Sequence, residues 1–287
     1  MTDDSYKLLD SGDLRKLEQI GPYRIVRPSP QAVWAPRLAP SEWQHADAAF
    51  TRHRGGDGSW NLRTKVADSW SIQLEGQVFQ IKLTDFGHLG LFAEQLDNWR
   101  AIHKVLEGHK GPEPLEVLNL FAYTGGSTLA AASAGAKVTH VDASKTSNAW
   151  ARENARMRHL DEHPIRWITD DVRKFLAREE RRGSAYHGVI LDPPSFGRGA
   201  KNEVWKIETD LPPLLSKLKA SLAKDYRFVL LSAHSANHTP LALKNLLMDM
   251  VGDARGSFTA EEMIIREESG RALPSGAYAM FVRNRPE

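Results

Sequence analysis

Short apolar runs alternate with amphipathic segments over the C-terminal two thirds of the chain. The apolar runs that predict strands cover residues 117–120, 137–141, 165–168, 187–191 and 227–231. The segments with helical spacing cover residues 147–160, 172–182, 206–223 and 240–251. Two alternating runs near the C-terminus predict a closing antiparallel hairpin. Strands that alternate with helices of this length are typical of a parallel sheet covered on both faces. We therefore predict an α/β domain with a doubly wound, mostly parallel sheet of seven strands.

The first 85 residues differ in pattern from the rest of the chain. Prolines and glycines divide them into short segments, and residues 69–74 and 77–83 alternate as antiparallel strands do. We therefore expect a small β-rich domain over residues 1–85 and a second domain over residues 86–287. The first domain contains Trp34, Trp43, Trp60 and Trp70. These tryptophans form its core or, alternatively, a surface on which a base stacks.

Composition narrows the classes of function. The 287 residues carry a formal net charge of +2, so no overall excess of charge favours nucleic acid. The sequence contains no cysteine, which excludes disulfides, thiolate metal sites and a cysteine nucleophile. No apolar run approaches the roughly 18 residues that a membrane-spanning helix needs, and the first ten residues do not resemble a signal peptide. We therefore expect a cytoplasmic protein without a membrane partner, and the sequence leaves its oligomeric state open.

Residues 115–142 combine a strand, a glycine turn, an Ala-rich helix and a second strand that ends on Asp142. In doubly wound domains this order binds a ligand with a nucleoside, because backbone N–H groups of the turn approach it and the acid accepts ribose hydroxyls. A dinucleotide site would show G-x-G-x-x-G. Here bulky side chains occupy two of those glycine positions, in the sequence Phe121-Ala122-Tyr123-Thr124-Gly125-Gly126. The turn therefore indicates S-adenosylmethionine (SAM), and a buried βαβ unit without a ligand is the alternative.

Acidic residues follow three of the first four predicted strands of this domain: Asp142, the pair Asp170 and Asp171, and Asp192. A single acid at such a position is common as a helix N-cap. Ligands in these sheets, however, bind at the carboxyl ends of the strands. We assign Asp142 to the ribose hydroxyls. Asp171 is assigned to the adenine amino group and Asp170 to a helix cap, or these two residues have the reverse roles.

The most specific short motif is Asp192-Pro193-Pro194-Ser195-Phe196. Two prolines directly after a buried strand can continue neither a helix nor a ladder, so they fix the backbone. The Asp192 carboxylate and the Pro193 carbonyl can then hold an exocyclic NH2 group and orient its lone pair toward a methyl donor, while Phe196 stacks on the ring. We predict Asp192, Pro193 and Phe196 as catalytic residues, and a purely structural turn is the alternative.

Taken together, these motifs resemble the class I SAM-dependent methyltransferases. The chain is most similar to the bacterial 23S ribosomal-RNA methyltransferases that act on cytosine C5 or on guanine. The matching segments are residues 90–100, 118–126, 141–144, 170–172 and 191–196. The resemblance implies a Rossmann-like methyltransferase fold, with the turn wrapped around the methionine part of SAM. The cofactor-binding residues that it implies are Phe92, Gln95, Phe121, Ala122, Tyr123, Thr124, Gly125, Asp142, Ala143, Asp171 and Val172, with no metal site.

Two departures from the family pattern limit the substrate. Cytosine-C5 members carry a cysteine in a Ser-Cys-Ser motif after the fifth strand, whereas this chain reads Ser232-Ala233-His234-Ser235. Covalent attack on cytosine C6 needs a thiolate, so that activity is excluded. The N-terminal region also matches no evident RNA-binding module. His234 and His238 lie near the expected acceptor site, as a proton acceptor or as surface histidines.

We therefore predict a SAM-dependent N-methyltransferase that acts on a nucleobase, with ribosomal RNA as its partner. A small-molecule methyltransferase and a SAM-binding protein without turnover are the alternatives. The Asp192 motif favours an enzyme, because a protein that only binds SAM has no use for an aspartate that orients an acceptor.

Overall fold

The computed structural model describes residues 5–53, 57–198, 204–235 and 237–284. These residues form two compact units. The first unit contains residues 1–94 and 264–275, and the second contains residues 95–263 and 276–287. The sequence predicted the boundary at residue 85 and one contiguous segment for each domain. The first unit instead continues to Glu94 and includes the tip of the C-terminal hairpin.

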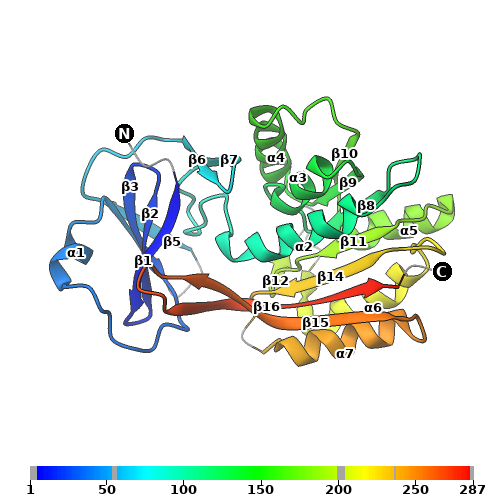
Figure 1. Ribbon diagram of the computed structural model, residues 1–287. Helices are drawn as coiled ribbons and strands as arrows, with labels where there is room; N and C mark the ends of the chain where they lie inside the picture. The colour runs from blue at the N-terminus through cyan, green and yellow to red at the C-terminus, as the bar shows by residue number, and fades with distance from the viewer. Residues whose placement is uncertain (1–4, 54–56, 199–203, 236, 285–287) are drawn as a thin grey trace. The chain divides into compact units, whose positions relative to one another are not determined.

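The second unit is built on a seven-stranded sheet (Figure 1). In spatial order its strands are β10 (Ile165–Thr169), β9 (Lys137–Asp142), β8 (Glu116–Leu120), β11 (Gly188–Leu191), β14 (Phe228–Ala233), β16 (Ala272–Arg283) and β15 (Gly256–Arg266). The first five are parallel, and β16 pairs antiparallel with β14. This arrangement confirms the predicted fold class, including the antiparallel hairpin at the edge.

Helices cover both faces of this sheet, with α3 and α4 on one side and α6 and α7 on the other (Figure 1). Their bounds are α2 (Leu96–Glu107), preceded by a 3-10 turn (Ala93–Gln95), α3 (Gly126–Ser133), α4 (Lys145–Met157), α5 (Val172–Arg182), α6 (Ile207–Lys219) and α7 (Pro240–Val251). One large core joins the sheet to α5, α6 and α7, and a smaller cluster joins α3 to α4. Within the described residues, no helix is long and apolar enough to cross a membrane.

The ends of α5 show why the sequence located this helix correctly. The Asp171 side chain accepts from the backbone N–H groups of Arg173 and Lys174, which are otherwise without helical partners. Gly183 ends the helix in the left-handed conformation, at φ 66°. Between these ends, Phe175 and Leu176 are buried in the core of the sheet. Local capping and apolar spacing therefore agree.

The first unit contains a five-stranded sheet in the order β1 to β5. The strands are β1 (Tyr6–Gly12), β2 (Arg15–Ile20), β3 (Tyr23–Pro28), β4 (Ala48–Arg52) and β5 (Gly58–Leu62). The short helix α1 (Pro40–Gln44) connects β3 to β4, which pair in parallel, and β6 (Trp70–Leu74) and β7 (Gln77–Ile81) form a separate hairpin. The β-rich N-terminal region predicted from the sequence is therefore present.

The tryptophans of this unit are part of its structure. Trp43 is buried. The indole N–H groups of the other three donate to backbone carbonyls: Trp34 to Ser11, Trp60 to Thr84 and Trp70 to Ile20, at 2.8–3.0 Å. Trp43 therefore belongs to the core, whereas the other three rings are only partly buried, and the base-stacking alternative stays a prediction for them.

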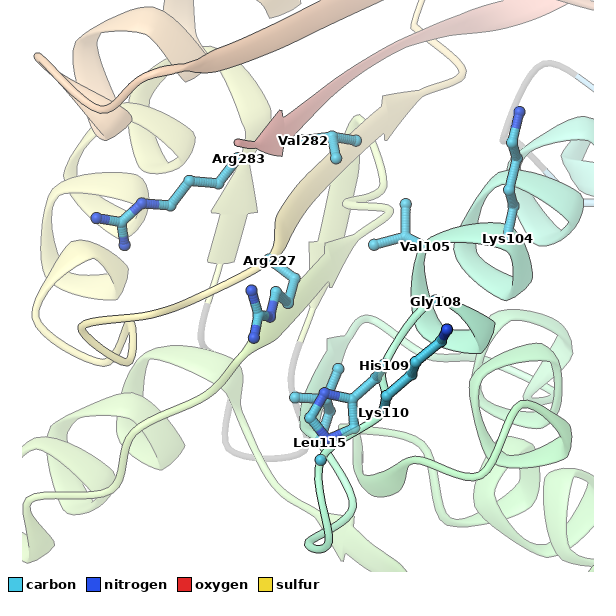
Figure 2. Close-up of a pocket in the computed structure, with 10 residues that line it drawn as sticks. Lys104, Val105, Gly108, His109, Lys110, Leu115, Arg227, Val282 and Arg283 are labelled. Carbon is cyan, nitrogen blue, oxygen red and sulfur yellow. The ribbon is translucent and has the colours of Figure 1, made fainter. Parts of the chain in front are cut away.

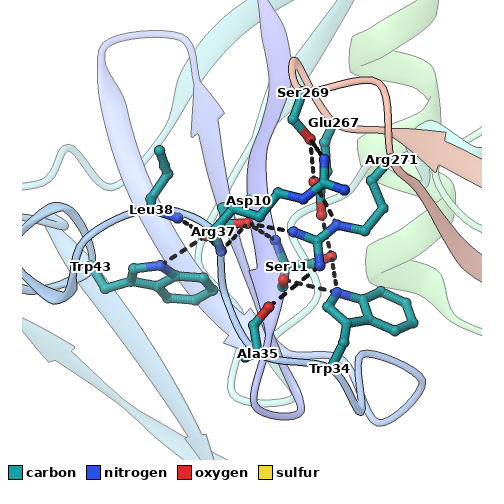
Figure 3. Close-up of polar contacts among 10 residues, drawn as sticks. All are labelled: Asp10, Ser11, Trp34, Ala35, Arg37, Leu38, Trp43, Glu267, Ser269 and Arg271. Atoms are coloured by element: carbon teal, nitrogen blue, oxygen red, sulfur yellow. Dashed lines mark hydrogen bonds and ion pairs between the residues drawn. The ribbon is translucent and has the colours of Figure 1, made fainter.

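A buried polar network ties residues 264–275 to the N-terminal strands (Figure 3). The Asp10 carboxylate is 1% exposed and accepts from the backbone N–H groups of Ser11, Arg37 and Leu38 at 2.8–2.9 Å. Arg271 lies 3.4 Å from the same carboxylate and donates to the buried Glu267 at 3.1 Å. These contacts satisfy both buried carboxylates, which would be costly to leave unpaired.

A second buried ion pair makes the stability of this unit dependent on pH. Burial opposes ionisation of Glu18, but Arg27, in bidentate contact at 2.7 Å, and Lys16 lower the pKa of Glu18 to about 2. Because this pKa is lower in the folded chain than in the unfolded one, the stabilisation is complete above about pH 4.5. It is lost as the pH falls toward 2. The loss amounts to about 3 kcal/mol.

The pH dependence of urea unfolding, compared between wild type and Glu18→Gln, measures this effect. We expect the difference in stability between the two proteins to shrink between about pH 4.5 and 2.5. A difference that stays constant over this range would show that Glu18 is not ionised in the folded protein.

Candidate active site

The turn after β8 has an unusual backbone. Phe121 and Tyr123 are in the left-handed region at φ 56° and 48°, and Gly125 follows at φ 88°. Non-glycine residues in this region cost of order 1–3 kcal/mol each and persist only where the surrounding structure holds them. Such strain is concentrated at ligand-binding sites. The turn at residues 121–126 is therefore a candidate binding loop, as the sequence predicted.

Contacts from three elements hold this turn in place. The Ala122 N–H donates to the carbonyl of Val141 at 3.1 Å, which ties the turn to β9. Asn154 of α4 donates from its side chain to the Thr124 carbonyl at 2.9 Å. At Gly126 a Cβ would lie 2.4 Å from the Trp99 ring of α2, so only glycine allows this approach. The conformation is thus fixed before any ligand binds.

Asp142 ends β9 and faces the turn. Its carboxylate accepts from the backbone N–H groups of Tyr123 and Ser144, both at 2.8 Å. Burial raises the pKa of Asp142 above its ordinary value, and these two hydrogen bonds offset part of that rise. Each carboxylate oxygen can accept a further bond, and added donors stabilise a half-buried carboxylate. The Asp142 carboxylate therefore fits a ligand with two neighbouring hydroxyls. Ala143, the next residue, is exposed and has a small side chain, so it does not block access to this carboxylate.

Of the two acids after β10, Asp171 and not Asp170 caps the helix, which is one of the two alternatives that the sequence left open. Asp171 is the N-cap of α5, and the Arg173 guanidinium also contacts its carboxylate. Asp170 forms an ion pair with Arg178. Val172 is buried in the core, so only its backbone is available to a ligand. Contact of Asp171 or Val172 with an adenine stays a prediction.

Asp192 lies at the same edge of the sheet as the turn and Asp142. The register pairs Leu191 with Leu120, and Leu120 with Val141, so the residues that follow these three strand positions lie side by side. Neighbouring strands are ~4.8 Å apart. The sequence prediction that these strand ends share one edge is therefore confirmed by the topology.

Three side chains fix the Asp192 carboxylate. Ser232 donates to Oδ1 at 2.8 Å, Gln95 donates to Oδ2 at 3.0 Å, and Nδ1 of His234 lies 3.4 Å from Oδ1. Burial alone would raise the pKa of Asp192, but the charge of His234 and these hydrogen bonds bring it below its ordinary value. The side chain is still 27% exposed. The Asp192 carboxylate is therefore an ionised, oriented hydrogen-bond acceptor at the carboxyl end of β11.

The residues after Asp192 form a short hairpin, β12 (Phe196–Arg198) and β13 (Val204–Lys206). Trp205 anchors it: its N–H donates to the Pro194 carbonyl at 2.7 Å, and its ring lies 4.8 Å from that of Phe121. Pro193 is buried, whereas the Phe196 side chain is 53% exposed. Phe196 can thus contact a ligand from solvent, and the Trp205–Phe121 contact couples the hairpin to the turn.

Gln95 and Phe92, the two remaining residues predicted to bind SAM, lie in different units. Gln95 donates to Asp192 and to Ser232, and its own oxygen accepts from Asn98 at 2.7 Å. Its expected contact with SAM stays a prediction. Phe92 belongs to the first unit, where its ring lies 5.5 Å from that of His88. Among the described residues, no group of His, Asp and Glu could hold a metal ion.

Several residues of the site were not assigned a role from the sequence: Asn98, Asn154, Trp205 and Ser232. Ser232 is 40 residues from its partner Asp192, and Asn154 is 30 residues from Thr124. No local spacing signals such contacts. The strand register of the structure explains the contact of Ser232, because Leu191 pairs with Leu231 and Ser232 therefore lies next to Asp192.

Comparison with known proteins gives the family. A family model described as S-adenosylmethionine-dependent methyltransferase matches residues 13–230. The chain is 39% identical to a SAM-dependent methyltransferase of known crystal structure from Agrobacterium tumefaciens; the two superpose with a TM-score of 0.91, over 98% of this chain and 91% of that one.

Two curated relatives are similar over shorter segments. Ribosomal RNA large subunit methyltransferase K from Neisseria meningitidis serogroup B is 28% identical over 163 residues, which are 56% of this chain and 44% of that protein. Ribosomal RNA large subunit methyltransferase I from Aeromonas salmonicida is 38% identical over 112 residues, which are 38% of this chain and 27% of that protein. The chain thus spans less than half the length of these two relatives.

The family match includes the turn, Asp142 and the Asp192 motif, and it also includes most of the first unit. The cofactor predicted from the turn is therefore that of the family. This chain belongs to the S-adenosylmethionine-dependent methyltransferases.

Proposed function

We propose that this protein is a SAM-dependent N-methyltransferase that acts on a nucleobase of ribosomal RNA in the cytoplasm. The observation that carries the proposal is the Asp192 carboxylate, fixed by Gln95, Ser232 and His234 and partly exposed one strand away from the cofactor turn. Two curated relatives are named as ribosomal RNA large subunit methyltransferases, which supports RNA as the substrate.

The proposal gives each group a task. SAM supplies an electrophilic methyl group when bound. The Asp192 carboxylate accepts from an exocyclic NH2 group and directs its lone pair, and it stabilises the positive charge that develops on the nitrogen. In its neutral form, the His234 imidazole, 3.4 Å from this carboxylate, can receive the proton that the nitrogen loses. Phe196 offers an exposed ring on which a base can stack.

Methyl transfer from tritiated SAM to total RNA, compared with a metabolite extract, tests the proposal. We expect label in RNA, and nucleoside analysis should find it on a base nitrogen, with no 5-methylcytosine because the chain lacks a cysteine nucleophile. Label only in the metabolite extract would establish the small-molecule alternative. No label in either, with SAM bound, would establish a SAM-binding protein without turnover.

Asp142 provides a separate test of the cofactor site. Asp142→Ala removes an acceptor for the ribose hydroxyls and should weaken SAM binding by about 1–3 kcal/mol, roughly 5- to 150-fold. Asp142→Asn, which keeps one carbonyl oxygen, should lose less. Calorimetric titration with SAM measures both. Unchanged affinity in Asp142→Ala, with the melting temperature also unchanged, would remove Asp142 from the cofactor site.

A further inference from the structure

A cavity lies at the end of the seven-stranded sheet that is opposite the candidate active site (Figure 2). Its volume is about 300 Å³. Residues from the end of α2, from the loop that leads into β8, and from the adjoining ends of β14 and β16 line it. They are Lys104, Val105, Gly108, His109, Lys110, Gly111, Leu115, Arg227, Val282 and Arg283. We call it the basic pocket.

The basic pocket is separate from the candidate active site. Leu115 directly precedes β8 and Arg227 directly precedes β14, so the pocket lies at the amino ends of these parallel strands. The turn and Asp192 lie at the carboxyl ends. A strand of five residues is ~16 Å long. A small molecule in the basic pocket therefore cannot also contact Asp192.

The lining is strongly cationic. Lys104, Lys110, Arg227 and Arg283 carry positive charges, and none of the described residues that line the pocket has a carboxylate. Arg227 has a carboxylate partner in Asp225, which is exposed and lies 4.0 Å from the guanidinium. An exposed pair at that separation contributes little. In a chain with a net charge of only +2, this is a local concentration of positive charge.

The cavity also has an apolar part. Leu115 is buried, and Figure 2 shows Val105 and Val282 turned toward the gap between α2 and β16. The Arg283 guanidinium is held over the Tyr226 ring, 4.9 Å from its centroid, and donates to the Lys224 carbonyl. The Arg283 guanidinium is thus held by its own neighbours, and in Figure 2 it points away from Val105 and Lys110. Arg227, Lys104 and Lys110 therefore remain as the cations available to a ligand.

We propose that the basic pocket binds a nucleotide, with the phosphate on the cationic rim and the sugar and base against the aliphatic floor. Guanidinium groups match phosphate oxygens in bidentate geometry, and a volume of about 300 Å³ is at the lower end of small-molecule sites. An inorganic anion alone would leave the aliphatic floor uncovered. The nucleotide has two chemical sources, a free mononucleotide or one residue of an RNA strand.

Binding of 5′-UMP, measured by calorimetry with S-adenosylhomocysteine at saturation, tests this inference. Saturation blocks the cofactor site, and a pyrimidine nucleotide lacks the adenine that this site binds. We expect Arg227→Gln to weaken 5′-UMP binding at least about tenfold, the scale of a lost charge-assisted hydrogen bond. Lys104→Glu should also weaken it, and 5′-UMP should bind more tightly than either uridine or inorganic phosphate.

Two control variants test whether a loss of 5′-UMP binding is specific to the basic pocket. Lys217→Glu makes the same charge change at another exposed lysine in the last turn of a helix, and it should bind 5′-UMP like wild type. Asp192→Ala should also leave 5′-UMP binding unchanged, so the inference can fail or succeed independently of the proposed function. Melting temperatures identify any variant that is not folded.

A second titration, with a single-stranded uridine decanucleotide, separates the two sources. Binding of the decanucleotide but not of 5′-UMP, weakened by Arg227→Gln and Lys104→Glu, would identify an RNA strand as the source. Absence of binding by both probes, equal binding of uridine and 5′-UMP, or equal losses in Lys104→Glu and Lys217→Glu would overturn the inference.

Discussion

Asp192→Ala is expected to lower the rate of methyl transfer by about two to three orders of magnitude, the scale of removing one preorganised charge-stabilising group. SAM affinity should stay nearly unchanged, because the turn at residues 121–126 follows β8, Asp142 ends β9, and both keep their own contacts. Single-turnover methyl transfer and calorimetric SAM binding on the same protein measure the two effects. Full activity in Asp192→Ala would end the catalytic interpretation of this motif.

Asp192→Asn distinguishes charge from geometry. Gln95 presents its N–H group to Asp192 because its own oxygen accepts from Asn98. An asparagine amide pointing toward Gln95 would set two donors against each other, and pointing toward Ser232 it would displace a hydroxyl that now donates. We therefore expect Asp192→Asn to be less active than wild type and closer to Asp192→Ala. A proportional loss of melting temperature, SAM binding and activity would instead indicate a structural turn.

Phe196→Ala should act differently, because its exposed ring contributes to binding of the acceptor. The expected loss is about 1–3 kcal/mol of stacking, seen as weaker binding of the acceptor. The rate at saturating acceptor should change little. A lower melting temperature in this variant would contradict the exposed position of the ring.

Asp10→Ala is expected to destabilise the first unit by about 3–5 kcal/mol, the scale of breaking a buried charge pair. The variant leaves three backbone N–H groups and the Trp43 indole N–H without their acceptor. It also leaves Arg271 with Glu267 as its one remaining carboxylate partner in the network. Urea unfolding followed by tryptophan fluorescence measures the loss, because Trp34 and Trp43 adjoin the network (Figure 3).

Arg24→Ala is the matched control for Asp10→Ala in the same unit. Arg24 forms an ion pair with Glu42, but both side chains are about 40% exposed. Such pairs contribute at most about 1 kcal/mol. Equal destabilisation by Asp10→Ala and Arg24→Ala would show that the buried network does not hold the hairpin tip in the first unit.

The sequence was informative wherever the signal was local. Helix α5 begins after the Asp171 cap and ends before Gly183, and the turn at residues 121–126 was recognised from consecutive residues. The shared edge of Asp142 and Asp192 also followed from the alternation of strands and helices, since parallel strands place their carboxyl ends together. Fold class and cofactor could therefore be predicted.

Contacts between distant residues could not be predicted in this way. The partners of Asp192 lie 97 residues before it and 40 residues after it, at Gln95 and Ser232. The choice between Asp170 and Asp171 as the cap depended on backbone angles that no residue type specifies. The assignment of residues 264–275 to the first unit depends on Asp10 and Glu267, two buried acids whose partners no periodic pattern indicates.

The discontinuous first unit also sets an order of events during synthesis on the ribosome. Its strands β1 to β5 emerge first, but the segment 264–275 emerges only after residues 95–263 have been made. At ~5–20 residues per second the wait is roughly ten to thirty seconds. During this time the nascent chain carries the Asp10 carboxylate without Arg271, and Leu8 and Ala32 without the Ile265 and Leu273 that cover them. The N-terminal strands therefore expose apolar surface that favours aggregation until the last residues of the hairpin have been made.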